Sequence, residues 1–137
     1  MCPQEGQMSH IVQGKIKTAF KDEELLMKAL AGLGTVKIND KLYRVGVGYT
    51  SEKYDIVLID ESNPHNRLGF NRHSGVFVQY QEEYGSVGAW TRRVSTKIQD
   101  RYIAFHYEKE LVKDGFDVSI QEHKDGTVEL LAEEAGW

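Results

Sequence analysis

The sequence has little cysteine and little proline, and it lacks any long apolar segment. Its 137 residues include one cysteine, Cys2, and two prolines. A single cysteine forms neither an intrachain disulfide nor a multi-cysteine zinc site within the chain, and it fits a reducing compartment. Uncharged stretches such as 56–59 and 75–81 are far shorter than the ~20 apolar residues that span a bilayer. We therefore predict a soluble cytoplasmic protein without a transmembrane helix.

Signatures of catalysis and of nucleotide binding are also missing. Gly46 and Gly48 alternate within a predicted strand, and neither a Gly-x-Gly-x-x-Gly motif nor a Walker lysine follows them. Ser74 lacks the Gly-x-Ser-x-Gly elbow of serine hydrolases. No standard zinc spacing occurs among the five histidines His10, His65, His73, His106 and His123. We predict a protein without cofactor or metal, and the net charge of -4 disfavours nucleic-acid binding.

What the chain does contain is typical of one folded domain. Hydrophobic residues make up 40% and charged residues 28% of the sequence, which is ordinary globular usage. Residues 1–8 are polar, precede a second methionine and carry neither the basic region nor the apolar region of a signal peptide. We predict a disordered leader over 1–8, a single domain over 9–131 and a frayed acidic tail over 132–137.

Apolar periodicity places the elements of the first half. Alternation over 12–20 predicts a strand, and Asp22 is the expected N-cap of a helix that ends at Gly34 with a left-handed C-cap. Residues 35–38 and the alternating run 43–49 read as a hairpin around Asn39 and Asp40. The apolar run 54–60 predicts a central strand covered on both faces. Strands over 68–71 and 76–80 are expected to form a hairpin at His73, Ser74 and Gly75.

The second half begins with a long amphipathic helix. Its apolar stripe comprises Trp90, Val94, Ile98, Tyr102 and Phe105, and Gly115 ends it. Two alternating strands around 118–120 and 128–130 follow, joined by a turn at 124–126. The order strand, helix, antiparallel strands, helix, hairpin predicts an α+β fold: a mostly antiparallel sheet with two helices packed on one face.

Polar loops and one helix face supply the candidate binding residues. Arg67, Asn71, Arg72 and His73 lie in or near predicted turns, and with Trp90 they form the surface that we expect to bind a partner. Solvated turn residues are the simpler interpretation of this cluster. The aromatic residues of the long helix, Trp90 included, are also read as core.

A basic line follows the same helix, because Arg93, Lys97 and Arg101 are spaced by four residues. This line could bind an acidic partner. The alternative is an ordinary solvated face beside the buried stripe.

Three alternatives remain open. His65 and His73 could bind an anion or act as an acid–base pair. A pocket between sheet and helices, with His73, Asp60 and Glu83, would make the protein a small enzyme or ligand-binding protein. However, adjacent carboxylates, such as Asp60 with Glu61 and Glu82 with Glu83, are more often solvated than catalytic. RNA binding would need exposed sheet aromatics such as Tyr43 and Tyr49.

An ordered set of features resembles the Ycf-thirty-five-like proteins of cyanobacteria and plastids. The similar features are the start at 8–10, the helix after Asp22, and the segments 46–49, 55–57, 69–70, 98–102, 115–116 and 125–127. The chain departs from the family in a longer loop at 60–67 and in the stretch 84–90.

The biochemical role of that family is not established, and the resemblance carries over no catalytic residue. It implies a small α+β protein of the cytoplasm or plastid stroma with an accessory role, beside an ATPase-type or ferredoxin-like partner. Together with the missing signatures, it leads us to expect a non-enzymatic binding or adaptor domain that acts with protein partners. Self-association through an edge strand is a further option.

Overall fold

The structure is a computed structural model that describes residues 11–14, 16 and 18–134. In chain order the elements are β1 (Ile11–Gln13), α2 (Glu23–Ala31), β2 (Thr35–Asp40), β3 (Tyr43–Arg44), β4 (Gly48–Tyr49), β5 (Tyr54–Asp60), β6 (Asn63–His73), β7 (Val76–Glu82), α3 (Gly85–Lys113), β8 (Phe116–Glu122) and β9 (Val128–Glu134). The predicted leader, residues 1–8, lies outside the described residues.

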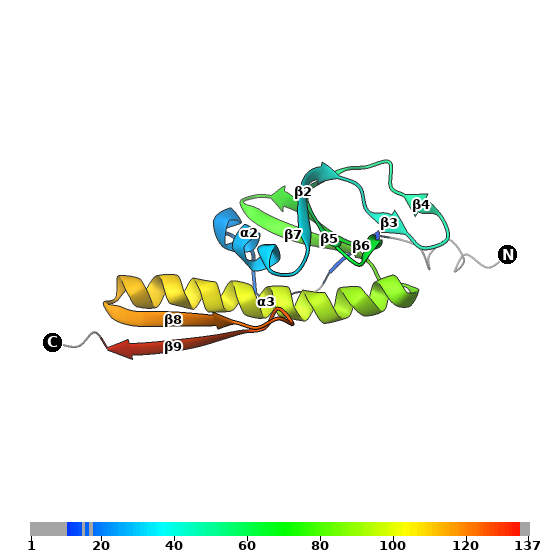
Figure 1. Cartoon of the computed structure of the whole chain (residues 1–137). Helices are drawn as coiled ribbons and strands as arrows, with labels where there is room; N and C mark the ends of the chain where they lie inside the picture. The colour runs from blue at the N-terminus through cyan, green and yellow to red at the C-terminus, as the bar shows by residue number, and fades with distance from the viewer. Residues whose placement is uncertain (1–10, 15, 17, 135–137) are drawn as a thin grey trace.

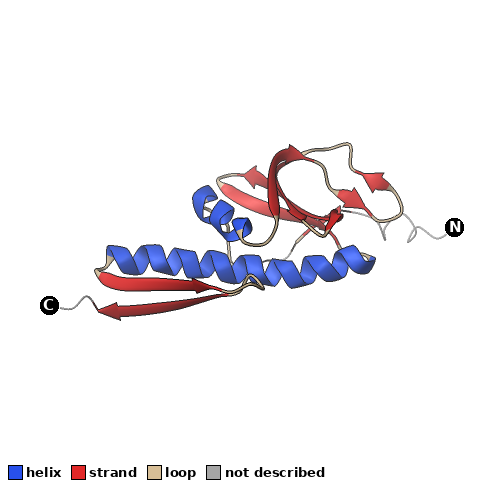
Figure 2. Cartoon of the chain, in the orientation of Figure 1, coloured by secondary structure: helices blue, strands red, loops and turns tan. Residues whose placement is uncertain are grey.

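A five-stranded sheet with the order β1-β7-β6-β5-β2 forms the centre of the molecule, and all its pairings are antiparallel. Both helices lie on one face of this sheet, and the long helix α3 extends well beyond it (Figure 1). The C-terminal hairpin, β8–β9, lies along α3 on the side away from the sheet (Figure 2). The predicted α+β class is confirmed.

The main core fills the space between the sheet and the two helices. From the sheet it includes Leu58, Leu68 and Phe70, and both helices add apolar side chains that recur at helical spacing. The ring of Phe20 meets Phe70 and Tyr102 edge to face, with ring centroids 6.0 and 5.0 Å apart. Burial of these large side chains is the main source of stability.

A smaller core covers the opposite, outer face of the sheet. It comprises Leu42, Tyr54, Val57 and Ile59. The chain around β3 and β4 folds over this face, and the Thr50 amide donates to the Leu42 carbonyl at 2.8 Å. Strand β5 is therefore buried on both faces as predicted, although it is the second strand from the sheet edge.

Short-range signals in the sequence match the structure well. The Asp22 side chain caps α2 by accepting from the Leu25 amide at 3.2 Å. Ser74 and Gly75 both have positive φ, at 51° and 81°, and join β6 to β7 as a tight turn. The last two strands form the expected hairpin, β8–β9.

Strand pairing is where the sequence analysis was wrong. Strand β2 pairs with β5, not with residues 43–49, which form the small separate hairpin β3–β4. Gly46 therefore lies in the turn between β3 and β4, with φ of 78°, and Gly48 is the first residue of β4, with φ of 112°. The segment 60–67 is not a long loop either, because β6 begins at Asn63 directly after a short turn.

Two boundaries also need correction. Helix α2 ends at Ala31 with Gly32 as its C-cap, so Gly34 is not a left-handed cap. A Cβ at Gly34 would overlap the Ile59 carbonyl oxygen, and this close approach of β2 to β5 is what requires glycine. Residues 132–134 pair with β8 and are not frayed, while 135–137 lie outside the described residues.

Among the described residues, no helical stretch combines the length and the apolar character needed to cross a membrane.

Candidate functional site

The outer face of the sheet carries a cluster of partly exposed aromatic side chains. Its members come from the β3–β4 hairpin and from β6, and we call them the aromatic surface: Tyr43, Val47, Tyr49, His65 and Arg67. Val47 is 60% and Tyr49 43% exposed. Large apolar side chains that stay exposed on one small surface are typical of a binding site.

The rings of this surface pack on one another. The His65 imidazole stacks on the Tyr43 ring, with centroids 3.8 Å apart and planes 2° apart. Tyr49 meets both rings at a steep angle, with centroids 5.2 Å from Tyr43 and 5.9 Å from His65. The Arg67 guanidinium carbon lies 4.8 Å from the centre of the Tyr49 ring. Stacking and cation–π contacts thus fix the ring orientations in the free protein.

Buried polar groups hold the hairpin against the sheet. The carboxylate of Glu82, which is 1% exposed, accepts from the Val45 amide at 3.0 Å and from the Tyr84 amide at 3.1 Å. Arg67 donates from Nη1 to the Lys41 carbonyl at 3.0 Å and from Nε to the Pro64 carbonyl at 2.7 Å. These bonds link β3–β4, β6 and β7, so the aromatic surface is preorganised.

Of the residues predicted for the binding surface, Arg67 belongs to this site. Its neighbours along β6 do not share one surface, because side chains alternate across the sheet. Arg72 points to the helix face, where it pairs with Glu23 and lies over the Phe77 ring. His73 is on the outer face at the far end of β6 and contacts the Tyr80 hydroxyl at 3.1 Å.

Asn71 and Trp90 have structural contacts. The Asn71 Oδ1 atom accepts from the Asp55 amide at 2.8 Å, across the β5–β6 pair. Trp90 is 5% exposed and belongs to the main core. This burial confirms the interpretation of Trp90 as core and removes it from the exposed binding surface.

The basic line on α3 is not one exposed stripe. Arg101 is 2% exposed and donates to the carbonyls of Ala29, Lys28 and Gly126 at 2.7, 3.2 and 3.2 Å. Lys97 donates to the Asp125 carbonyl. Arg93 is exposed, but two members of the line fasten α3 to α2 and to the β8–β9 hairpin.

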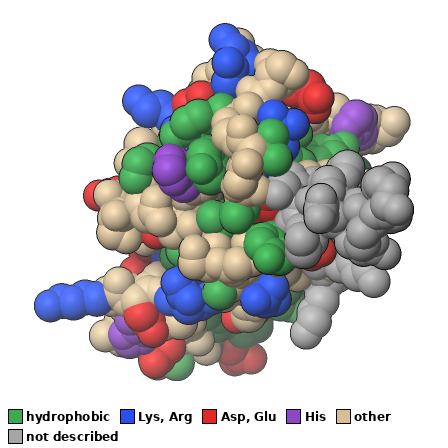
Figure 3. Space-filling view, turned by 90° about the vertical axis from the view of Figure 1, so that its right-hand side faces the viewer, with side chains coloured by type: hydrophobic (Ala, Val, Ile, Leu, Met, Phe, Trp, Pro, Cys, Tyr) green, Lys and Arg blue, Asp and Glu red, His purple; other side chains and the backbone are tan. Residues whose placement is uncertain are grey.

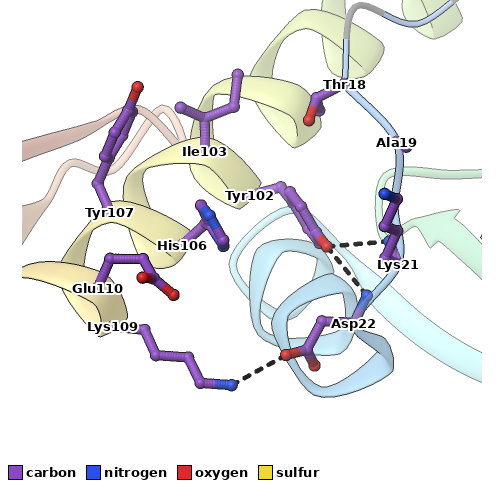
Figure 4. Close-up of a pocket in the computed structure, with 10 residues that line it drawn as sticks. All are labelled: Thr18, Ala19, Lys21, Asp22, Tyr102, Ile103, His106, Tyr107, Lys109 and Glu110. Carbon is purple, nitrogen blue, oxygen red and sulfur yellow. Dashed lines mark hydrogen bonds and ion pairs between the residues drawn. The ribbon is translucent and has the colours of Figure 1, made fainter. Parts of the chain in front are cut away.

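A cavity of about 700 Å³ lies between the chain at 18–22 and the second half of α3. Figure 4 shows hydrogen bonds between its two walls: the Tyr102 hydroxyl accepts from the Lys21 and Asp22 amides at 3.1 and 3.0 Å. Asp22 also pairs with Lys109 at 3.1 Å. The bond from the Leu25 amide and the pairing with Lys109 lower the pKa of Asp22 below its ordinary value. This cavity is a groove whose walls are joined by these hydrogen bonds and by this ion pair.

The residues of the predicted enzyme pocket do not converge. His73 and Asp60 lie at opposite ends of the β5–β6 hairpin. Burial raises the pKa of Asp60, but hydrogen bonds from Asn66 and Ser62 outweigh it and leave that pKa below the ordinary value. Glu83 lines the cavity between β7 and α3.

Within the described residues, no three His, Cys, Asp or Glu side chains are grouped so that they could hold a metal ion. Comparison with protein families, with curated proteins and with solved structures found no match to this chain. The resemblance to the Ycf-thirty-five-like proteins therefore stays a prediction from the sequence.

The sequence analysis named Tyr43 with Tyr49 for RNA binding, and it named His65 and Arg67 in other candidate sites, so it did not bring the four residues together. The signal that could have found the site was the pair of tyrosines flanking a glycine turn, because such a turn brings the two rings to the same face of a hairpin.

Proposed function

We propose that this protein is a non-enzymatic adaptor domain that binds a protein partner through the aromatic surface. The observation that carries the proposal is the preorganised cluster of Tyr43, Tyr49, His65 and Arg67 beside the exposed Val47. Tyrosine and arginine are enriched among the residues that dominate binding energy in protein interfaces. Rings that are already fixed lose little conformational entropy when a partner covers them.

The setting of the surface supports a protein partner. Figure 3 looks at the end of the molecule that bears β3 and β4, and hydrophobic side chains lie there among basic, acidic and histidine side chains. Such a mixture of apolar and charged groups suits an interface with an apolar centre and a polar rim. Tyr84, which is 44% exposed, borders the site because its amide and that of Val45 bind the same Glu82 carboxylate.

RNA binding is the weaker candidate. One face of the Tyr43 ring is occupied by His65, so a base could stack there only after the imidazole moved. Two of the three basic side chains in the line on α3 are engaged in contacts within the fold. The negative net charge further weakens attraction to a phosphate backbone.

The proposal extends to the partner and its compartment. We propose an ATPase-type or ferredoxin-like partner in the cytoplasm or plastid stroma, which is what the family resemblance implies. Self-association of this chain is a second outcome that the experiment below distinguishes, since crosslinks would then join two copies of the chain.

A photocrosslinking amino acid placed at Tyr49 tests the proposal in cells that make the protein naturally. We expect a discrete crosslinked protein, identified by mass spectrometry, and about a tenfold or greater loss of its affinity in the Tyr49→Ala variant. The matched control is Tyr107, an exposed tyrosine at the other end of the molecule that is 57% accessible. Equal crosslinking at both positions, or none at Tyr49, would reject the aromatic surface as the binding site.

A further inference from the structure

The cavity between β1, β7 and the first half of α3 has a volume of about 530 Å³ and a polar lining. Amide, hydroxyl and charged side chains project into it: Gln81, Ser95, Thr96, Gln99, Glu83 and Arg92. None of the lining residues that the structure describes is aromatic. Without a ring to stack on, the lining disfavours a nucleobase and favours a small ligand rich in hydrogen-bonding groups.

Buried amides lie behind this lining. Gln79 and Gln81 occupy the helix face of β7, in line with the core residue Phe77, and are 1% and 5% exposed. Gln79 Nε2 donates to Gln81 Oε1 at 2.6 Å and to Ser95 Oγ at 3.0 Å. No described residue donates to Gln79 Oε1. Burying an amide with an unpaired oxygen costs stability, and such breaks in the apolar pattern concentrate at functional sites.

The residue directly after β1 is a glycine, Gly14, and it makes room for these amides. A Cβ at Gly14 would overlap Gln81 Oε1 and would lie 2.9 Å from Gln79 Nε2. Any other residue at this position would push the amide pair away from the strand. The sequence therefore accommodates the buried amides from both sides, through Gly14 directly after β1 and through Ser95 on α3.

Two opposite charges border the same cavity. Arg92 Nη1 lies 3.5 Å from the Glu83 carbonyl oxygen, so the guanidinium is held next to Glu83. The Glu83 carboxylate accepts from Gln81 Nε2 at 3.2 Å and keeps further acceptor sites. A guanidinium binds a carboxylate with two parallel hydrogen bonds, and a carboxylate binds an ammonium group. The charges of Arg92 and Glu83 are opposite, so the lining complements a ligand that carries one negative and one positive group.

We propose that this cavity binds a free amino acid with a polar side chain. Arg92 holds the ligand carboxylate and Glu83 holds its ammonium group. The Gln81 amide and the Ser95 hydroxyl receive its side chain, while the Gln99 amide holds Ser95 by donating to it. This site is separate from the aromatic surface, so either assignment can fail without the other.

Side-chain amide resonances provide the test. The full chain, labelled with ¹⁵N, is titrated with L-glutamine, and the side-chain signals of Gln79, Gln81 and Gln99 are followed. We expect saturable shifts of these signals with L-glutamine and none at the same concentrations of propionate or propionamide, which supply only one of the required groups each. Equal shifts with propionate would make this an anion site, and unchanged amide signals with L-glutamine would overturn the proposal outright.

Variants of residues that line the cavity test whether the ligand binds there. Arg92→Gln and Glu83→Gln should each weaken L-glutamine binding about tenfold, because each removes a charge-assisted hydrogen bond. Arg93→Gln is the matched control, since Arg93 is the next residue of the helix, is exposed and does not line the cavity. Tyr49→Ala should also bind normally. Unchanged affinity in both Arg92→Gln and Glu83→Gln would contradict the assigned roles.

Discussion

The interface between the sheet and α3 has an apolar region and a polar region. In the apolar region the Phe20 ring meets the Phe70 and Tyr102 rings edge to face within the main core. In the polar region Gln79 and Gln81 occupy the equivalent face of β7, where Gln79 donates to Gln81 and to the Ser95 hydroxyl of the helix. The comparison teaches that one sheet–helix interface can serve two purposes. The apolar region stabilises the fold, and the polar region gives up stability to keep hydrogen-bonding groups at a cavity.

The largest expected effect comes from breaking the apolar region. Phe70→Ala removes a fully buried ring and should lower the free energy of unfolding by about 3–5 kcal/mol. Urea denaturation followed by circular dichroism measures this loss. Tyr107→Ala, at an exposed position, should stay within about 0.5 kcal/mol of the parent protein. A loss below about 1 kcal/mol at Phe70 would mean that the apolar region is not the main source of stability.

The second effect concerns the rim of the apolar region, where Arg101 joins α3 to α2 and to the β8–β9 hairpin. Arg101→Met keeps much of the side-chain volume but leaves the carbonyls of Lys28, Ala29 and Gly126 without their donor. We expect a loss of about 2–4 kcal/mol in the same denaturation experiment. Arg93→Met, at an exposed position of the same basic line, should be close to neutral. Equal stability of the two variants would show that the Arg101 contacts contribute nothing.

The third effect is a pH dependence of stability, which arises from Asp22, the N-cap of α2 beside the apolar region. Asp22→Ala should cost about 1 kcal/mol at neutral pH because the Leu25 amide loses its acceptor. The folded-state pKa of Asp22 is lowered, first by the Leu25 amide and then by Lys109. Its charge-dependent stabilisation is therefore complete above the unfolded-state pKa of about 3.9 and is lost as the pH falls through the lower folded-state pKa.

Asp22→Asn separates the cap from the charge, since asparagine caps helices about as well as aspartate. We expect this variant to lose less stability than the parent protein when the pH is lowered from neutrality into the acid range. Unfolding midpoints in urea at several pH values measure the difference. Parallel pH profiles for the two proteins would show that Asp22 does not contribute to acid sensitivity.

The smallest effect on stability is expected in the polar region. Gln79→Leu replaces an amide whose oxygen has no donor among the described residues, and it should change the free energy of unfolding by no more than about 1 kcal/mol in either direction. The same change should disturb L-glutamine binding, because Gln79 holds Gln81 and Ser95 in place. A loss comparable to that of Phe70→Ala would erase the distinction between the two regions.

Several elements were predictable because their signals are short-range. The Asp22 cap, the turn at Ser74 and Gly75 and the apolar stripe on α3 depend on residues a few positions apart. The partner of β2 was not predictable in this way. Residues 43–49 are closer along the chain, but pairing with β5 places Val36 beside Leu58 and buries a continuous apolar face.

The site was predicted only in fragments. Arg67 belongs to the aromatic surface that we propose as the site, whereas Arg72 and His73 point to opposite faces because successive residues of a strand alternate. The spacing of Arg93, Lys97 and Arg101 correctly placed three cations on one helix face. It could not show that Arg101 would be covered by α2 and by the β8–β9 hairpin.

The sequence by itself determined where most helices and strands form and which turns join neighbouring strands, because capping, turn chemistry and hydrophobic periodicity act over a few residues. The tertiary structure alone decided which strands pair across the sheet, which charges are buried and which aromatic rings meet. Those outcomes depend on contacts between residues far apart in the chain. Arg101 reaches Ala29 across 72 positions, and Glu82 reaches Val45 across 37.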